Sequence, residues 1–179
     1  MTDAPTRRLP ETWRLSDEPD DAPAVTALFR EYYTEVAQRY HTLHGWPRIT
    51  PEEIDEGVAE YPMGQLTPPH GALFVVWRAD GEAAGCAGLL LIDGGRTAEL
   101  KRVFVREPWR GRGAAGALMR AVERRAAELG AERLRLDTRR DLSEAVALYR
   151  AFGYVEISAY KEDRYAEVFF EKRLAGGGE

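Results

Sequence analysis

The segment that most restricts the fold is a glycine-rich turn, Arg110-Gly111-Arg112-Gly113-Ala114-Ala115-Gly116, directly ahead of a long helical pattern. The first backbone N–H groups of a helix have no partner within it, and the helix dipole adds partial positive charge there. A plain strand-to-helix turn needs fewer than three glycines and two arginines. We therefore predict that this turn binds phosphate or pyrophosphate, with Gly111 and Gly113 allowing close approach to the backbone.

The same segment also satisfies the dinucleotide-binding pattern G-x-G-x-x-G, through Gly111, Gly113 and Gly116. An acidic residue, Asp137, follows at a suitable distance. Two observations argue against that interpretation. The residues 106–110 separate the turn from the preceding strand, and the chain after Asp137 is too short for the further βαβ units of a doubly wound fold. The strands before the turn also have the pattern of an antiparallel meander.

The apolar patterns predict an α/β (α+β) fold, with a mixed, mostly antiparallel central sheet flanked by about four helices. Strands are expected at 12–15, 71–78, 84–92, 98–106, 133–137, 155–158 and 167–173, and helices at about 23–40, 51–61, 114–129 and 141–152. Asp141 is expected to cap the last helix. Strict alternation along 98–106 places Glu99 on the same side of the strand as Val103 and Val105.

Length and composition indicate one domain over residues 1–179, with 1–10 and 175–179 expected to be disordered. No apolar run approaches the roughly 18 residues that span a bilayer, and no secretory pattern follows the first charges. One cysteine, Cys86, cannot form an internal disulfide, so we expect a cytoplasmic protein. Residues 1–98 carry 8 basic and 16 acidic side chains. This acidic half disfavours nucleic acid and suits a cationic small molecule.

Two motifs resemble the GNAT superfamily of acyl-CoA-dependent N-acetyltransferases. Its signature R/Q-x-x-G-x-G/A is matched by Arg110-Gly111-Arg112-Gly113-Ala114-Ala115. Its second motif, A-x-x-L-Y-x-x-x-G-F/Y, is matched by residues 145–154. Both occur in the family's order with a strand between them, and the element order from 12 to 173 also fits. Residues 99–102 and 165–172 resemble a bacterial subgroup of small GNAT proteins.

The resemblance implies that acetyl-CoA is the co-substrate and that no metal is needed. Backbone groups at the end of the strand before the turn would bind the acyl-CoA arm and acetyl carbonyl, and the turn would bind the pyrophosphate. The cofactor-binding residues are then Val103, Phe104, Val105, Arg110, Gly111, Arg112, Gly113, Ala114, Ala115 and Gly116. Tyr149 would lie near the thioester sulfur and protonate the leaving thiolate. Its alternative role is a core tyrosine.

Two positions need separate comment. Many members carry Asn seven residues before the tyrosine, where this chain has Leu142, so that contact with CoA is expected to be lost or supplied by backbone. Some members place a catalytic glutamate where this chain has Glu99. We predict that Glu99 acts as general base through water, with a pKa raised by a half-buried cleft. The alternative is an ion pair with Lys101 or Arg102.

The acceptor is expected to be a small-molecule primary amine, with a protein N-terminus or lysine as second choice. Side chains before residue 56 provide a candidate aromatic and acidic wall that suits a cation: Tyr32, Tyr33, Tyr40, His41, His44, Trp46, Glu31, Glu35, Glu52, Glu53 and Asp55. No third metal ligand accompanies the histidines. We expect a monomer or homodimer without nucleic-acid or membrane partners. The alternative function is a non-catalytic acyl-CoA-binding or sensing module.

Overall fold

The computed structural model describes residues 6–19, 21–60 and 64–175. The strands of these ranges form one seven-stranded sheet in the order β1-β2-β3-β4-β5-β7-β6. The strands are β1 Arg14–Asp17, β2 Gly71–Trp77, β3 Ala83–Ile92, β4 Thr97–Val105, β5 Arg133–Thr138, β6 Val155–Ile157 and β7 Val168–Arg173. Within the described ranges, β4–β5 is the only parallel pair. This confirms the expected fold class.

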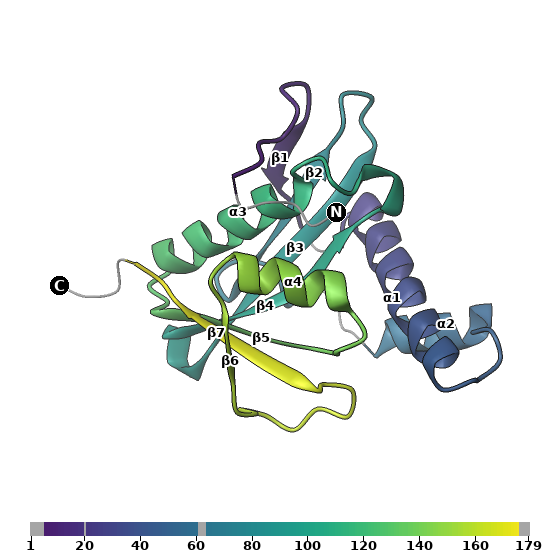
Figure 1. The fold of residues 1–179 in the computed structure, drawn as a ribbon. Helices are drawn as coiled ribbons and strands as arrows, with labels where there is room; N and C mark the ends of the chain where they lie inside the picture. Colours follow the sequence, from purple (N-terminus) through teal and green to yellow (C-terminus); the bar gives the residue numbers. More distant parts are fainter. Residues whose placement is uncertain (1–5, 20, 61–63, 176–179) are drawn as a thin grey trace.

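Four α-helices cover the two faces of this sheet in the described ranges: α1 Pro23–Leu43, α2 Pro51–Ala59, α3 Ala114–Glu128 and α4 Ser143–Ala151. Figure 1 shows α3 and α4 crossing one face, while α1 and α2 lie on the other side. Residues of α3 and α4 form the larger apolar cluster, which includes Leu118, Met119, Leu148 and Phe152 against the sheet. Val25, Leu28 and Phe29 of α1 form the second cluster.

The two shorter helices differ at their N-terminal ends: α2 has the predicted cap, and α4 does not. Thr50 and Glu53 form the expected capping box of α2. The expected cap of α4 is wrong, because Leu142 occupies the N-cap position. Asp141 instead accepts two hydrogen bonds from the Arg139 guanidinium, at 2.8 and 2.9 Å. A bidentate arginine is a stronger partner for a carboxylate than one backbone N–H.

Strand β4 contains an irregularity at Arg102, which has a left-handed φ of 54°. The register with β3 shifts there, since Phe104 opposes Cys86 whereas Lys101 opposes Gly88. A bulge of this kind reverses the alternation of side chains beyond it. Val105 therefore packs in the cluster beneath α3 and α4, together with Leu100. Glu99 points to the other face, so its expected placement beside Val103 and Val105 is wrong.

Strands β4 and β5 pair over a short stretch and then diverge. Their pairing covers only Thr97, Ala98 and Glu99 of β4. Beyond this point β5 continues along β7 as far as Thr138, while β4 continues along β3. The β5-facing edge of residues 101–105 consequently borders an opening in the sheet. The glycine turn and the start of α3 follow at the end of this opening.

Candidate active site

The glycine turn has the backbone conformation that the sequence predicts for an anion site. Gly111 and Gly113 both have left-handed φ angles, of 73° and 86°. Gly113 is the N-cap of α3 and supplies no side-chain cap. The positive end of a fifteen-residue helix therefore begins at Ala114, directly after the opening between β4 and β5. This is the geometry on which a phosphate-binding site depends.

The two arginines of the turn have different surroundings. Arg110 binds both carboxylate oxygens of Glu35 at 2.7 and 2.8 Å and donates to the Val105 carbonyl at 2.8 Å. It thus joins the turn to α1 and to the end of β4. The Arg112 guanidinium lies 5.9 Å from the centre of the Trp109 ring. The structure therefore gives Arg110 a clear scaffolding role, while its predicted contact with CoA stays a prediction.

An N-terminal segment lies against this turn, a contact that no pattern in the sequence indicates. The Arg7 guanidinium donates to the Gly111 carbonyl, and Arg120 of α3 donates to the Arg7 carbonyl at 3.2 Å. A Cβ added at Gly113 would lie 2.6 Å from the Arg8 carbonyl oxygen. The close approach at Gly113 is thus made by the chain's own backbone. It also brings the cationic side chain of Arg7 to the turn.

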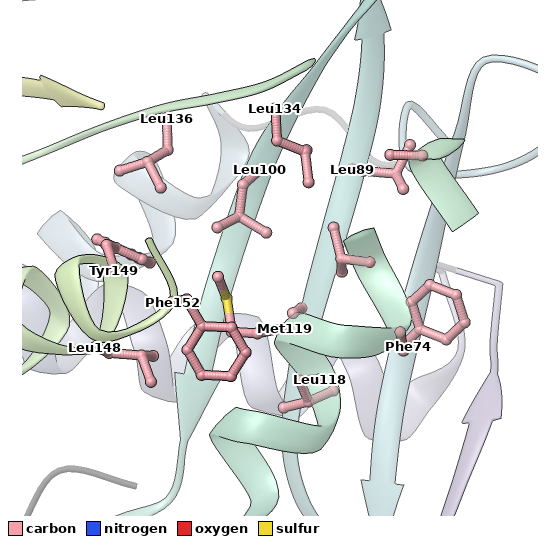
Figure 2. Packing of buried hydrophobic residues seen from close by; sticks show 14 of the residues in the cluster. Phe74, Leu89, Leu100, Leu118, Met119, Leu134, Leu136, Leu148, Tyr149 and Phe152 are labelled. Carbon is pink, nitrogen blue, oxygen red and sulfur yellow. The ribbon is translucent and has the colours of Figure 1, made fainter. Parts of the chain in front are cut away.

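Tyr149 is buried in α4, with only 7% of its surface exposed. Figure 2 shows it among Leu148, Phe152 and the sheet residue Leu136 in the larger core. Burial raises the pKa of its phenol, and the nearby Tyr32 and Asp137 raise it further. The hydroxyl therefore stays protonated at neutral pH and is available as a donor. This state fits both the core role and the predicted acid role.

Glu99 lies in a network of polar side chains on the α1 side of the sheet. Tyr160 donates to its Oε2 at 2.7 Å, Lys161 lies 3.1 Å from the same oxygen, and Lys101 pairs with Oε1. Burial raises the pKa of this carboxyl, but the bonds and charges of these partners outweigh it and hold the pKa below its usual value. The expected raised pKa is thus wrong, and the predicted alternative, an ion pair with Lys101, is present.

Replacing Glu99 with glutamine is expected to lower the free energy of unfolding by about 2 kcal/mol at pH 7, because three donors lose a charged acceptor. A carboxylate whose pKa is lowered on folding stabilises the protein above its unfolded pKa of about 4.3, and this contribution disappears as the pH falls through the folded value. Urea unfolding of both proteins should therefore converge at acidic pH. An equal difference at pH 7 and at about pH 3 would contradict this.

A cavity of about 360 Å³ lies on the α1 side of the sheet, between α1, α2, β4 and the loop before β7. It is lined by five of the six predicted aromatic and histidine side chains: Tyr32, Tyr33, Tyr40, His41 and Trp46. His44 stacks on Tyr40 at 4.1 Å instead. Of the predicted acids only Glu53 lines the cavity, since Glu31, Glu35 and Asp55 pair with arginines.

The cavity also has lining residues that the sequence analysis missed. Asp137 and Arg139 come from the end of β5, Lys101 and Arg102 from β4, and Asp163 and Tyr165 from the loop before β7. The wall is therefore mixed in charge, where the sequence suggested an acidic one. Only the position of Asp137 at the end of a predicted strand offered a signal. The loop residues could not be placed without the fold.

The remaining candidates have simple outcomes. Leu142 presents an apolar side chain at the start of α4, as its identity requires. Cys86 is fully buried, and burial raises the pKa of its thiol to about 12, which suits a small core residue.

Across the described ranges, no three His, Cys, Asp or Glu side chains form a group that could hold a metal ion. No helix in these ranges has the length and apolar character needed to cross a membrane.

Comparison with known proteins identifies the class that this fold and site define. The Acetyltransferase (GNAT) family matches residues 22–154. The chain belongs to this family, and it is an acyl-CoA-dependent acetyltransferase.

Three proteins are similar to this chain in sequence or in fold. An uncharacterised N-acetyltransferase of Schizosaccharomyces pombe is 28% identical over 152 residues, covering 85% of this chain and 87% of that protein. A Klebsiella pneumoniae structure, described as a candidate acyl-CoA N-acyltransferase, is 25% identical with a TM-score of 0.66, covering 90% of this chain and 97% of that one. A GNAT-family acetyltransferase from Staphylococcus aureus shares the fold at 16% identity, with a TM-score of 0.71 and coverage of 90% and 99%.

Proposed function

We propose that this protein transfers the acetyl group of acetyl-CoA to the primary amine of a small molecule, by direct attack in a ternary complex. The observation that carries the proposal is the opening between β4 and β5, which has the glycine turn at one end and borders residues that line the cavity. The turn suits the pyrophosphate of CoA, and the cavity suits an acceptor. Both substrates would then meet at the middle of β4.

In the proposed reaction the acceptor first gives one proton to water, because only a neutral nitrogen attacks a thioester. The nitrogen then bonds to the acetyl carbon, and the bond between that carbon and sulfur breaks. Tyr149 gives its proton to the leaving thiolate and regains one from the nitrogen. Backbone groups of residues 103–105 would hold the acetyl carbonyl. The products are the N-acetylated amine and CoA.

The role of Glu99 as general base stays a prediction, and its contacts favour the structural alternative. Three polar partners already surround its carboxylate, and it does not line the cavity in the described part of the chain. If Glu99 nevertheless takes the proton through water, the turnover defect of Glu99→Gln should be largest at low pH. A defect that does not change with pH would mean that Glu99 is structural.

Two alternatives remain distinct from this proposal. A protein N-terminus or lysine would have to enter the cavity from an extended chain, and its acetylation would appear with peptides rather than small amines. A non-catalytic acyl-CoA-binding module would bind the nucleotide without turnover. A buried tyrosine whose pKa is raised by burial and by the charge of the cavity-lining Asp137 supports catalysis over simple binding.

Acetyl-CoA and CoA are expected to raise the melting temperature, whereas NADH at the same concentration is expected to leave it unchanged. A ligand that binds only the folded state stabilises it by about 2.7 kcal/mol at 100 times its Kd. One helix N-terminus with a short glycine turn suits the pyrophosphate of CoA. Differential scanning fluorimetry tests this. Stabilisation by NADH and not by CoA would contradict the proposed co-substrate.

A further inference from the structure

Asp137 occupies a distinctive place in the cavity. It lies on β5 beyond Arg135, the last residue of that strand that pairs with β4, and therefore beside the opening in the sheet. Its side chain is 21% exposed and lines the cavity. Among the carboxylates that line it, Asp137 comes from the part of the sheet where β4 and β5 separate. The others, Glu53, Glu60 and Asp163, come from α2, its C-terminal cap and a loop.

The Asp137 carboxylate is held from one side by a lysine. Lys161 Nζ lies 2.5 Å from Asp137 Oδ1 and 3.1 Å from Glu99 Oε2, so it bridges the two diverging strands. In the described part of the chain, Lys161 is the ion-pair partner of Asp137, and one ammonium does not fill the roughly four acceptor positions of a carboxylate. Tyr160 and Lys101 fix Glu99 in turn. Asp137 is thus positioned rigidly while retaining acceptor capacity.

The charge of the Asp137 carboxylate also affects the pKa of Tyr149, the residue proposed to protonate the leaving thiolate. The charge of Asp137 contributes to the raised pKa of Tyr149, as does Tyr32, which also lines the cavity. An ammonium group bound at Asp137 would consequently lie within electrostatic reach of the Tyr149 hydroxyl. This is the neighbourhood where the proposed attack takes place.

The rest of the cavity contains many rings, and two of them already face a guanidinium. Tyr40 packs edge-on against Trp46 and Tyr165, with centroids 5.6 and 5.4 Å apart. Arg102 lies 4.1 Å from the Phe29 ring centre, and Arg139 lies 5.1 Å from that of Tyr40. These two rings already contact a guanidinium, so they offer less cation–π stabilisation to a second positive charge on the acceptor. A flat, neutral body would pack against the rings.

We propose that the acceptor is an aromatic amine with a single positive charge, whose ammonium group binds Asp137 while its ring packs against Tyr40, Trp46 and Tyr165. This inference rests on the proposed acetyl transfer and names the substrate class for it. Asp137 is a substrate-binding residue in this account. Lys161 is a positioning residue that acts through Asp137.

The first test compares amines on the wild-type protein with saturating acetyl-CoA. 2-Phenylethylamine is expected to give a kcat/KM at least 10-fold above that of spermidine, with butylamine between them, because its ring adds apolar contact, whereas the further charges of spermidine must be desolvated beside rings that already contact a guanidinium. Quenching of tryptophan fluorescence by 2-phenylethylamine in the CoA complex gives a second readout. Preference for spermidine, or no binding of 2-phenylethylamine at millimolar concentration to a protein that binds CoA, would overturn the proposal.

The second test replaces Asp137 with asparagine. The KM for 2-phenylethylamine is expected to rise about 10- to 100-fold, as for loss of a charged hydrogen bond, while the KM for acetyl-CoA changes less than about twofold. Glu123→Gln is the matched control. It removes a carboxylate of similar exposure that pairs with Lys172 at 2.8 Å and lies outside the cavity lining. Equal amine KM values for Asp137→Asn and the wild type would overturn the assignment.

These outcomes separate this proposal from the proposed function. A protein that binds no acetyl-CoA, or releases no thiol with any amine or peptide, contradicts acetyl transfer itself. A protein that acetylates spermidine or a peptide but not 2-phenylethylamine remains an N-acetyltransferase, and only the substrate class fails. The wild-type comparison keeps the proposal testable should Asp137→Asn not fold.

Discussion

Replacing Tyr149 with phenylalanine is expected to lower kcat about 100-fold, the usual scale of general acid–base assistance. The change removes only the hydroxyl, and the ring stays packed against Tyr154 and Phe170, whose centroids lie 6.1 and 6.2 Å away. The melting temperature and the KM for acetyl-CoA should therefore change little. Steady-state release of the CoA thiol measures kcat directly.

Tyr154→Phe provides the matched control for this variant. Tyr154 belongs to the same buried cluster and is 3% exposed, against 7% for Tyr149. Removal of its hydroxyl is expected to leave kcat within about twofold, because the proposed proton transfer uses the Tyr149 hydroxyl and not that of Tyr154. Full turnover by Tyr149→Phe would exclude the acid role, and equal losses in both variants would indicate a general effect on the core.

Replacing Gly113 with valine is expected to weaken CoA binding at least tenfold, by disturbing the start of α3 where phosphate is expected to bind. The residue has a φ of 86°, which a β-branched side chain rarely adopts, and its Cβ would press on the Arg8 carbonyl at 2.6 Å. We expect an accompanying loss of stability of about 1–3 kcal/mol. Isothermal titration with CoA measures the affinity.

Gly130→Val separates backbone strain from loss of the anion site. Gly130 has nearly the same φ, 87°, and an added Cβ would meet open space at the opposite end of α3. The Gly130→Val protein should lose stability through backbone strain and keep wild-type affinity for CoA. If Gly113→Val folds and binds CoA as the wild type does, the phosphates lie elsewhere.

The parts of the site that the sequence could predict are those that local chemistry defines. The left-handed glycines at the start of α3 follow from a glycine-rich turn ahead of an apolar helical pattern. The placement of Tyr149 on the buried face of α4 follows from the spacing of Ala145, Leu148 and Phe152. The mixed sheet follows from turn signals between short apolar runs.

The side on which Glu99 lies could not be predicted in the same way. A count of alternating positions assumes an unbroken strand, and nothing in Lys101-Arg102-Val103 marks a bulge. Its cause is tertiary, since β4 must pair with β3 along its length and with β5 only at its start. The resulting reversal moved Glu99 away from Val105.

Contacts between residues that are far apart in the sequence account for the other differences between the predicted site and the observed one. Tyr160 and Lys161 reach Glu99 from a loop 61 and 62 positions later in the chain, and Arg7 reaches Gly111 across 104 positions. Asp137 acquires its place in the cavity only because β5 leaves β4 after Arg135. Such neighbours depend on strand order and loop course, for which the sequence carries no periodic signal.

The most direct test of acetyl transfer is to follow CoA thiol release from acetyl-CoA with and without an amine, while mass spectrometry follows the amine. Thiol release is expected to depend on the amine and to equal, mole for mole, the N-acetylated product. A panel of aromatic monoamines, polyamines, aminoglycosides and peptides covers the acceptor classes under consideration. Tight CoA binding with no amine-dependent thiol release from any member of the panel would contradict catalysis and favour the binding module.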